Sequence, residues 1–388
     1  MAPPRRPKIR ASDLCGFKYF KILGPLLDRL HHDALSRDRA HNRQLHYDQY
    51  AALILLYFFN PILTSLRGIQ QASALDKVQK QLGCERAALG SLSEASRVFD
   101  PQLLRDIIGE LADQAVPLVR GREAEALRGL TAVDGSFLPA LSKMAWALWK
   151  DDQHRAAKMH VHFDVLRGIP VEATLTPGVG SETKQLRATL QPGRLYVIDR
   201  GYAEYQLFQD IIDRGSSFIG RLRDNAVWDT LEERPVSAAA QAAGVRRDLV
   251  VVLGDRHTCA ALKQALRVVE VDTGKTNSYG RPETLLLATN RLDLDAELVA
   301  LGYRYRWAIE LFFRWFKCVL GCKHLLSTDA DGVTIQVYLG IIASLLISIW
   351  TGKKPTKRTW EMLQFYFSGW ATEDELMQHI QKLQDHPA

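Results

Sequence analysis

Cysteine is scarce in this chain, and the few present form no recognisable framework. The 388 residues include five cysteines and no CxxC pair: Cys15, Cys84, Cys259, Cys318 and Cys322. This usage excludes a disulfide-stabilised secreted scaffold and predicts free thiols in a reducing compartment. Cys318 and Cys322 are one helical turn apart, but without a second pair they make a weak zinc motif.

The sequence also lacks a secretory leader and a clear membrane span. Its start, MAPPRRPKIR, is basic and has no apolar core of the kind that a signal sequence needs. The most apolar run, TIQVYLGIIASLLISIW at 334–350, is short for a span and contains Gln336. We therefore expect a buried core helix there, no membrane partner and a cytoplasmic protein.

Charge of one sign does not dominate, and several common motifs are missing. The 50 Lys and Arg against 44 Asp and Glu give a net charge of +6, which permits a polyanionic partner without requiring one. There are no internal repeats, no phosphate-binding loop pattern and no nucleophile elbow. The length predicts two or three structural units.

The first third of the chain has the periodicity of helices. Residues 11 to about 125 contain short helical segments joined by polar and Gly-containing turns, which resemble a helix-turn-helix array. The pattern is equally typical of a small helical scaffold, so DNA binding by this part is an even alternative at this level.

From residue 129 the pattern changes to strands. LTAVDGSFL, AKMHVHFDVL and PVEATLTP are three successive strand candidates, RLYVIDRGY is a fourth and SSFIGRLR a fifth. Helices are expected in GSETKQLRATL and AEYQLFQDIIDRG, so the order predicts a mixed α/β sheet. Residues 223–300 interrupt this order with further β-type segments and are predicted to form a β-rich insertion.

Residues 303–320 are predicted to form one helix with two different faces. Glu310 is the only carboxylate on the polar face, and an i,i+4 pair with Arg306 on a solvated surface would be worth about 0.3 kcal/mol. That polar face also holds Tyr303 and Lys317. The other face is an apolar stripe that we expect to be buried: Tyr305, Ala308, Ile309, Phe312, Phe316, Val319 and Leu320.

Two aspartates elsewhere are potential partners of Glu310. Asp134 ends the strand-like run in LTAVDGS, and Asp199 ends the one in LYVIDRGY. Either alone is ordinary, because Asp commonly begins a turn after a strand. Three converging carboxylates need cations between them, and nucleases and polymerases use two divalent ions about 3.5–4 Å apart. Mg²⁺ suits such a site because it prefers hard oxygen ligands.

At these residues the sequence resembles the insertion sequence 4 family of DDE transposases. VDGS and DRGY look like that family's first and second acidic motifs, and the resemblance spans roughly 129–350. All four residues and all three gaps of the family's Tyr-(2)-Arg-(3)-Glu-(6)-Lys signature are present, at Tyr303, Arg306, Glu310 and Lys317.

The resemblance implies a ribonuclease-H-like mixed α/β sheet with flanking helices, a β-rich insertion and an all-helical N-terminal domain. We expect a DNA-binding domain over 1–125, a catalytic domain over 126–350 and a helical C-terminal segment over 351–388. The implied catalytic and metal-binding residues are Asp134, Asp199 and Glu310. The implied DNA-backbone contacts are Tyr303, Arg306 and Lys317.

The resemblance also implies cofactors and partners. Two Mg²⁺ ions are expected, with Mn²⁺ as a substitute, and the partner is double-stranded DNA: the terminal inverted repeats of the element and the target DNA. A homodimer would hold paired ends in a synaptic complex, on the bacterial nucleoid. Some family members hold a flipped base with a tryptophan of the insertion, and Trp228 is the only tryptophan in 224–300 here.

Two alternative functions remain open from the residues. A two-metal nuclease with the same core would cut DNA without joining it, and a transposase-derived DNA-binding protein would be catalytically silent. The intact acids argue against the silent alternative. A separate motif, KMHVHFD, places His160, His162 and flanking polar residues on one strand face, which favours zinc or iron. No third ligand is obvious, so we expect only a sheet face near the active site.

Overall fold

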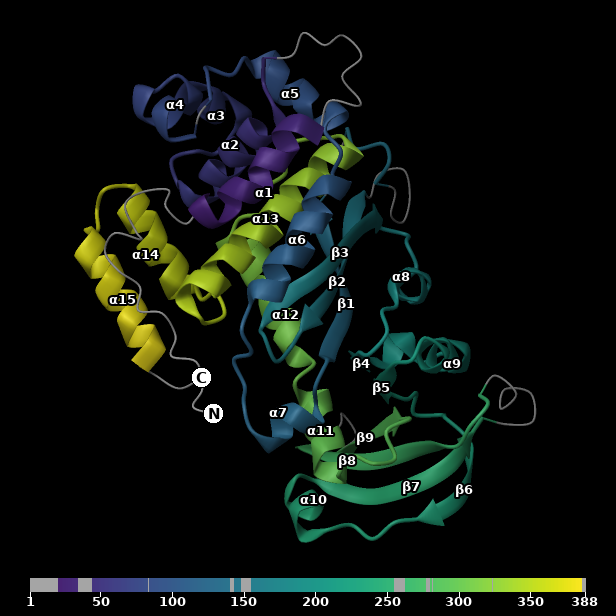
Figure 1. Cartoon of the computed structure of the whole chain (residues 1–388). Coiled ribbons are helices and arrows are strands. Elements are labelled where there is room, and N and C mark those ends of the chain that lie inside the picture. The colour runs from purple at the N-terminus through teal and green to yellow at the C-terminus, as the bar shows by residue number, and fades with distance from the viewer. Residues whose placement is uncertain are drawn as a thin grey trace.

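A single nine-stranded sheet runs through the molecule in the order β3-β2-β1-β4-β5-β9-β8-β7-β6 (Figure 1). It is seen in a computed structural model, which describes residues 20–33, 44–82, 84–139, 143–147, 155–254, 262–276, 280, 282–322 and 324–385. Helices flank the sheet, and the expected mixed α/β fold, with its helical N-terminal part and β-rich insertion, is confirmed.

The first five strands follow the predicted order. β1 is antiparallel to β2, β2 is antiparallel to β3, and β1 is parallel to β4, which is parallel to β5. Alternating side chains of a strand face opposite sides of the sheet, and β1, β4 and β5 contribute to two separate cores in this way. Their bounds are β1 (Leu130–Pro139), β2 (Ala156–Asp164), β3 (Ile169–Pro177), β4 (Leu195–Ile198) and β5 (Ser217–Arg221).

The insertion extends this sheet and is not a separate layer. Its last strand pairs with β5 in antiparallel fashion, and the other insertion strands follow as an antiparallel meander. The segments RRDLVVVL, ALRVVEVD and ETLLLATN predict three of its strands, β7, β8 and β9, and no pattern predicts β6. The insertion contains β6 (Trp228–Glu233), α10 (Ala238–Ala242), β7 (Val245–Leu253), β8 (Leu266–Thr276) and β9 (Pro282–Thr289).

Helices α6 (Gln102–Gln114) and α13 (Ala330–Thr351) pack on one face of the sheet, against β3, and α2 and α5 pack in turn on α13 (Figure 1). Tyr338 of α13 donates a hydrogen bond to the carbonyl oxygen of Ala173 in β3 at 2.9 Å, so this contact lies inside one shared core. The N-terminal helices are α1 (Phe20–Asp33), α2 (Tyr47–Phe59), α3 (Leu66–Ser73), α4 (Asp76–Leu82), α5 (Leu89–Val98), α6 (Gln102–Gln114) and α7 (Arg122–Ala126).

Helix α13 contains the apolar run that the sequence analysis assigned to the core. By length and composition it could cross a membrane, but 89% of its most apolar window is buried inside the protein. Its Gly340 allows a close approach, since a Cβ atom there would lie 2.7 Å from Cys322 Sγ. The prediction of a buried core helix is confirmed. Two further helices follow, α14 (Lys357–Phe367) and α15 (Glu373–Asp385).

A second, smaller core fills the other face of the sheet. It is covered by α8 (Glu182–Thr189) and α9 (Tyr205–Asp213), whose apolar side chains pack on β4, β5 and the insertion strands. Phe208 of α9 stacks on Phe218 of β5 with ring centroids 4.4 Å apart. The face under α8 and α9 is therefore closed by apolar packing.

The prediction of one continuous helix over 303–320 is wrong. The chain forms α11 (Ala296–Arg304), turns at Tyr305 and Arg306, continues as α12 (Trp307–Arg314) and ends in a π-helical turn, η5 (Trp315–Val319). The buried side comes close to the expected stripe, because Ile309, Phe312, Phe316 and Leu320 are buried. The breaks are tertiary in origin, since helical periodicity alone continues through them.

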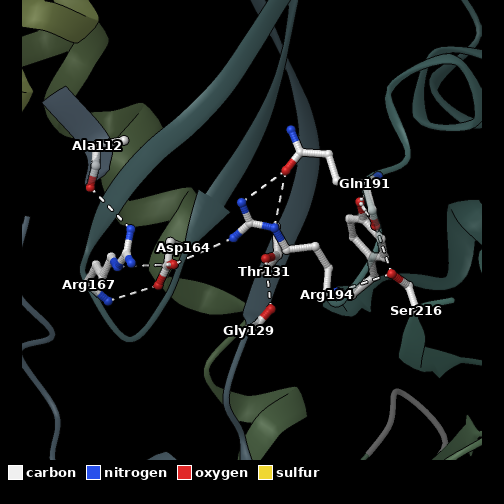
Figure 2. Close-up of polar contacts among 9 residues, drawn as sticks. Ala112, Gly129, Thr131, Asp164, Arg167, Gln191, Arg194 and Ser216 are labelled. Carbon is white, nitrogen blue, oxygen red and sulfur yellow. Dashed lines mark hydrogen bonds and ion pairs between the residues drawn. The ribbon is translucent and has the colours of Figure 1, made fainter. Parts of the chain in front are cut away.

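Figure 2 shows a polar cluster at the beginning of β1. Asp164, which pairs with Thr131 across β1 and β2, lies between two arginines, with its Oδ2 3.7 Å from Arg194 Nη1 and 3.8 Å from Arg167 Nε. Arg167 also donates to the carbonyl oxygen of Ala112 at 3.1 Å. This cluster ties α6 to the turn after β2 and to the start of β4, so we assign it a role in stability.

Candidate active site

Asp134 and Asp199 come from neighbouring parallel strands. Ala132 of β1 pairs with Val197 of β4, and continuing that register by two places brings Asp134 level with Asp199. Both point to the sheet face that holds Ala132 and Val197, because residues two apart in a strand share a face. The two predicted aspartates are therefore adjacent.

The pKa of Asp134 shows how close these charges are. Burial is the largest cause that raises the pKa of Asp134 to about 6, and the negative charge of Asp199 adds to this increase. The amide of Gly135, which donates to Asp134 Oδ1 at 2.8 Å, and the guanidinium of Arg306 act in the opposite direction. Positive charge in the protein therefore does not fully offset the burial of Asp134 and its negative neighbour.

Arg306 lies between two of the predicted acids. Its Nη2 is 2.6 Å from Glu310 Oε1, and its Nη1 is 3.9 Å from Asp134 Oδ2. The i,i+4 pair that the sequence suggested therefore exists. It is not a solvated surface pair, because the arginine side chain is only 16% exposed and also reaches a carboxylate of the sheet.

The remaining signature residues line the same region. The ring of Tyr303, at the end of α11, has its centroid 6.0 Å from Arg306 Cζ. Burial raises the pKa of Tyr303, to which Asp199 also contributes. Lys317, in the π-helical turn, donates to Ser136 Oγ at 2.9 Å, and Ser136 shares the sheet face of Asp134.

Sequence reasoning missed Glu182, which pairs with Lys158 of the KMHVHFD segment. Lys158 Nζ of β2 is 2.7 Å from Glu182 Oε1, at the first turn of α8. Glu182 adds to the raised pKa of Asp134, and a Cβ atom on Gly135 would lie 2.6 Å from Glu182 Oε1. Gly135 thus leaves room for a fourth carboxylate beside the predicted site. No local sequence signal marks this approach, since it depends on how α8 packs on the sheet.

The histidines of KMHVHFD face α8 and make structural contacts. His160 Nε2 is 2.9 Å from Thr176 Oγ1, and His162 Nε2 is 3.1 Å from Thr189 Oγ1. Burial is the main reason that the pKa of His160 is lowered to about 4 and that of His162 to about 3. These imidazoles are neutral members of the packed sheet face.

The carboxylate oxygens of the candidate site have the chemistry that a hard divalent cation prefers. They do not, however, lie close enough together to form a preformed metal site. Among the residues that the structure describes, no three His, Cys, Asp or Glu side chains form a group that could hold a metal ion. In the site, the guanidinium of Arg306 separates Glu310 from Asp134. Carboxylate oxygens with a deficit of positive charge are nevertheless the ligands that Mg²⁺ prefers.

Comparisons with known proteins agree on a class. The family model described as transposase DDE domain matches residues 125–346. The transposase y4zB of Sinorhizobium fredii is 26% identical over 66% of this chain and 70% of its own length. The transposase for insertion sequence element IS5377 of Geobacillus stearothermophilus is 24% identical over 59% of this chain and 59% of its own.

A solved structure also resembles the chain. It is the cryo-EM structure of the piggyBac transposase synaptic complex with hairpin DNA, with a TM-score of 0.40 and 11% identity over 96% of this chain and 85% of that chain.

The chain belongs to the transposase DDE domain family. This class comprises DNA transposases, enzymes that cut and join DNA, usually with a divalent metal ion, and DNA is their partner. The prediction of a DDE transposase is confirmed. The roles of the individual signature residues stay predictions.

Proposed function

We propose that this transposase cuts DNA at the ends of its element and joins the freed 3′-OH to target DNA. One observation carries the proposal: β1 and β4 are parallel neighbours that bring Asp134 and Asp199 to one level, where Arg306 links Asp134 to Glu310. The three acids come from distant parts of the chain and are brought to one region by the fold.

Asp134, Asp199 and Glu310 would hold two Mg²⁺ ions, or Mn²⁺ in their place, and these would supply activation of the attacking oxygen and stabilisation of the leaving one. Backbone amides of the chain hold two of these carboxylates in place by hydrogen bonds. Gly135 N donates to Asp134 Oδ1 at 2.8 Å, and Gly201 N donates to Asp199 Oδ1 at 2.7 Å. These bonds orient the carboxylates before any ligand arrives.

Arg306 has two parts in this proposal. In the protein alone it partly compensates the charges of Asp134 and Glu310, and with DNA bound its planar guanidinium exchanges a carboxylate for a phosphate oxygen. Tyr303 and Lys317 contact the DNA backbone on either side of it. Their positions beside Arg306 and Ser136 support this assignment.

The remaining parts of the proposal concern organisation. We propose DNA binding by residues 1–125, catalysis by 126–350 with the insertion at 223–300, and a supporting helical segment over 351–388. The substrate is double-stranded DNA, as terminal inverted repeats and as target, and a homodimer holds two ends together. The protein acts in the cytoplasm, on the bacterial nucleoid.

Substitution of the acids tests the proposal directly. Glu310→Gln and Asp199→Asn should leave binding of an end duplex, taken from the DNA that flanks the gene, unchanged while abolishing its cleavage with Mg²⁺. Glu361→Gln, the same change on a 43% exposed side chain of α14, is the matched control. Cleavage at the wild-type rate by Glu310→Gln would refute the assignment, and cutting without joined products would favour the nuclease alternative.

A further inference from the structure

A cavity of about 760 Å³ opens beside Asp199, between the end of β4 and α11. Its volume is within the range of about 300–1,000 Å³ that holds small ligands and nucleotide-sized groups. Its charge is positive on balance, because four arginines line it, against the two carboxylates of Asp199 and Asp224: Arg200, Arg221, Arg223 and Arg306. Tyr303 closes one side of it.

The parallel strands explain why arginines gather next to an acid. Ile198 of β4 pairs with Gly220 of β5, so the next residues in register, Asp199 and Arg221, lie at the same level of the sheet. Arg200 follows Asp199 in a short 3₁₀ turn, and Arg223 begins the connection to the insertion. The cavity is therefore on the β5 side of Asp199, whereas Asp134 is on the β1 side.

The carboxylate of Asp224 lies among these arginines, in a position that a bound anion could occupy. Its Oδ2 lies 3.1 Å from Arg200 Nη1, and its Oδ1 lies 4.0 Å from Arg221 Nη2. The carboxylate is 74% exposed, so these pairs contribute little to stability. Arg223 is exposed and has no ion-pair partner among the residues that the structure describes.

We propose that this arginine cavity binds the DNA backbone on the β5 side of the bond that is cut. Arg221 and Arg223 contact phosphates there, and in the free protein Asp224 occupies the position of one phosphate. The inference rests on the proposed function, since it presumes that the cut bond lies over Asp134 and Asp199. A guanidinium fork suits phosphate and carboxylate alike, which is why Asp224 can be displaced by a phosphate.

Two substitutions in the same ion pair should have opposite effects on affinity. Arg221→Gln should weaken binding of a fluorescein-labelled end duplex roughly tenfold, by loss of one charge-assisted contact, and reduce the slope of log K against log salt by ~0.9. Asp224→Asn should tighten binding about two- to fivefold, by removal of an exposed competing pair. A structural role for the pair would make both changes weaken binding.

Uncharged methylphosphonate linkages in the DNA can identify the phosphate that Arg221 contacts. A methylphosphonate placed in turn at each linkage beside the cut should weaken binding to the wild type at one linkage and leave binding to Arg221→Gln unchanged there. Arg223→Gln, on an exposed side chain, provides a second variant that does not depend on Arg221. Arg247→Gln, whose exposed side chain pairs with Glu233 in the insertion, is the matched control and should bind as the wild type does.

The outcomes separate this inference from the proposed function. If Arg221→Gln and Arg223→Gln bind like the wild type at every salt concentration, or if Asp224→Asn binds more weakly, the phosphate subsite is wrong. Asp199→Asn tests the active site in the same assays. Loss of cleavage by Asp199→Asn together with unchanged arginine variants overturns the subsite alone, whereas cleavage by Asp199→Asn overturns the proposed active site.

Discussion

The ammonium nitrogen of Lys317 lies 2.9 Å from Ser136 Oγ, which ties the π-helical turn after α12 to the strand that carries Asp134. The wide turn is closed by a bond from Leu320 N to the carbonyl oxygen of Trp315, at 3.0 Å. Single π-turns occur frequently at functional sites, where they redirect a side chain. Here the turn places a lysine on the acidic face of β1.

Lys317→Ala should weaken DNA-end binding roughly tenfold and lower the slope of log K against log salt by ~0.9, because a lost phosphate contact releases one counterion fewer. Anisotropy titrations across a salt series measure both. Ser136→Ala removes the hydrogen-bond partner without removing charge, so its slope should match the wild type. An unchanged slope for Lys317→Ala would exclude a phosphate contact.

Arg306→Gln should make the protein more responsive to Mg²⁺. Without the guanidinium, Asp134 and Glu310 lose the positive charge that compensates them, so the metal-free protein should melt lower and Mg²⁺ should raise its melting temperature more than in the wild type. Calorimetry with and without the ion measures this difference. Equal Mg²⁺-induced shifts in the two proteins would contradict competition between arginine and metal.

The insertion contains a buried ion pair. Arg267 Nη2 lies 2.6 Å from Asp248 Oδ2, and both side chains are at most 5% exposed. Arg267→Met should reduce the free energy of unfolding by about 3–5 kcal/mol, because it leaves a buried carboxylate unpaired. Urea unfolding measures the loss.

Arg247, the residue before Asp248 in β7, supplies the control for this prediction. Arg247→Met breaks an exposed pair with Glu233 and should cost less than ~1 kcal/mol. Asp248→Leu combined with Arg267→Met should recover much of the lost stability. If Arg267→Met and Arg247→Met reduce the free energy of unfolding by the same amount, burial does not determine how much the Asp248–Arg267 pair contributes to stability.

Stability should fall in mild acid because of His162. Burial is the main reason that the pKa of His162 is lowered to about 3 in the folded protein. Below about pH 6.5 the imidazole is therefore protonated in the unfolded chain but stays neutral in the folded one. The free energy of unfolding therefore drops as pH falls from 6.5 toward 3, by up to about 1.4 kcal/mol per pH unit. His162→Gln should show a shallower decline in urea unfolding at pH 5 relative to pH 8. Parallel curves for the two proteins would argue against it.

Local patterns were enough to predict much of this molecule. Segments rich in Val, Ile, Leu and Thr predicted β1 to β5, helical patterns predicted α8 and α9 between them, and a run of apolar residues predicted α13. The spacing of Tyr303, Arg306, Glu310 and Lys317 pointed to the transposase class, which the family match confirms. Such signals succeed because strand and helix geometry repeat over a few residues.

Contacts between distant segments were decided only by the folded chain. The pairing of β9 with β5 joins the insertion to the core sheet, and the break before Trp307 divides the predicted helix. Likewise, only packing brings Glu182 to Gly135 and sets Arg221 level with Asp199. These relations depend on strand register and on how helices dock, which are set by the total of many long-range contacts and leave no periodic trace in the sequence.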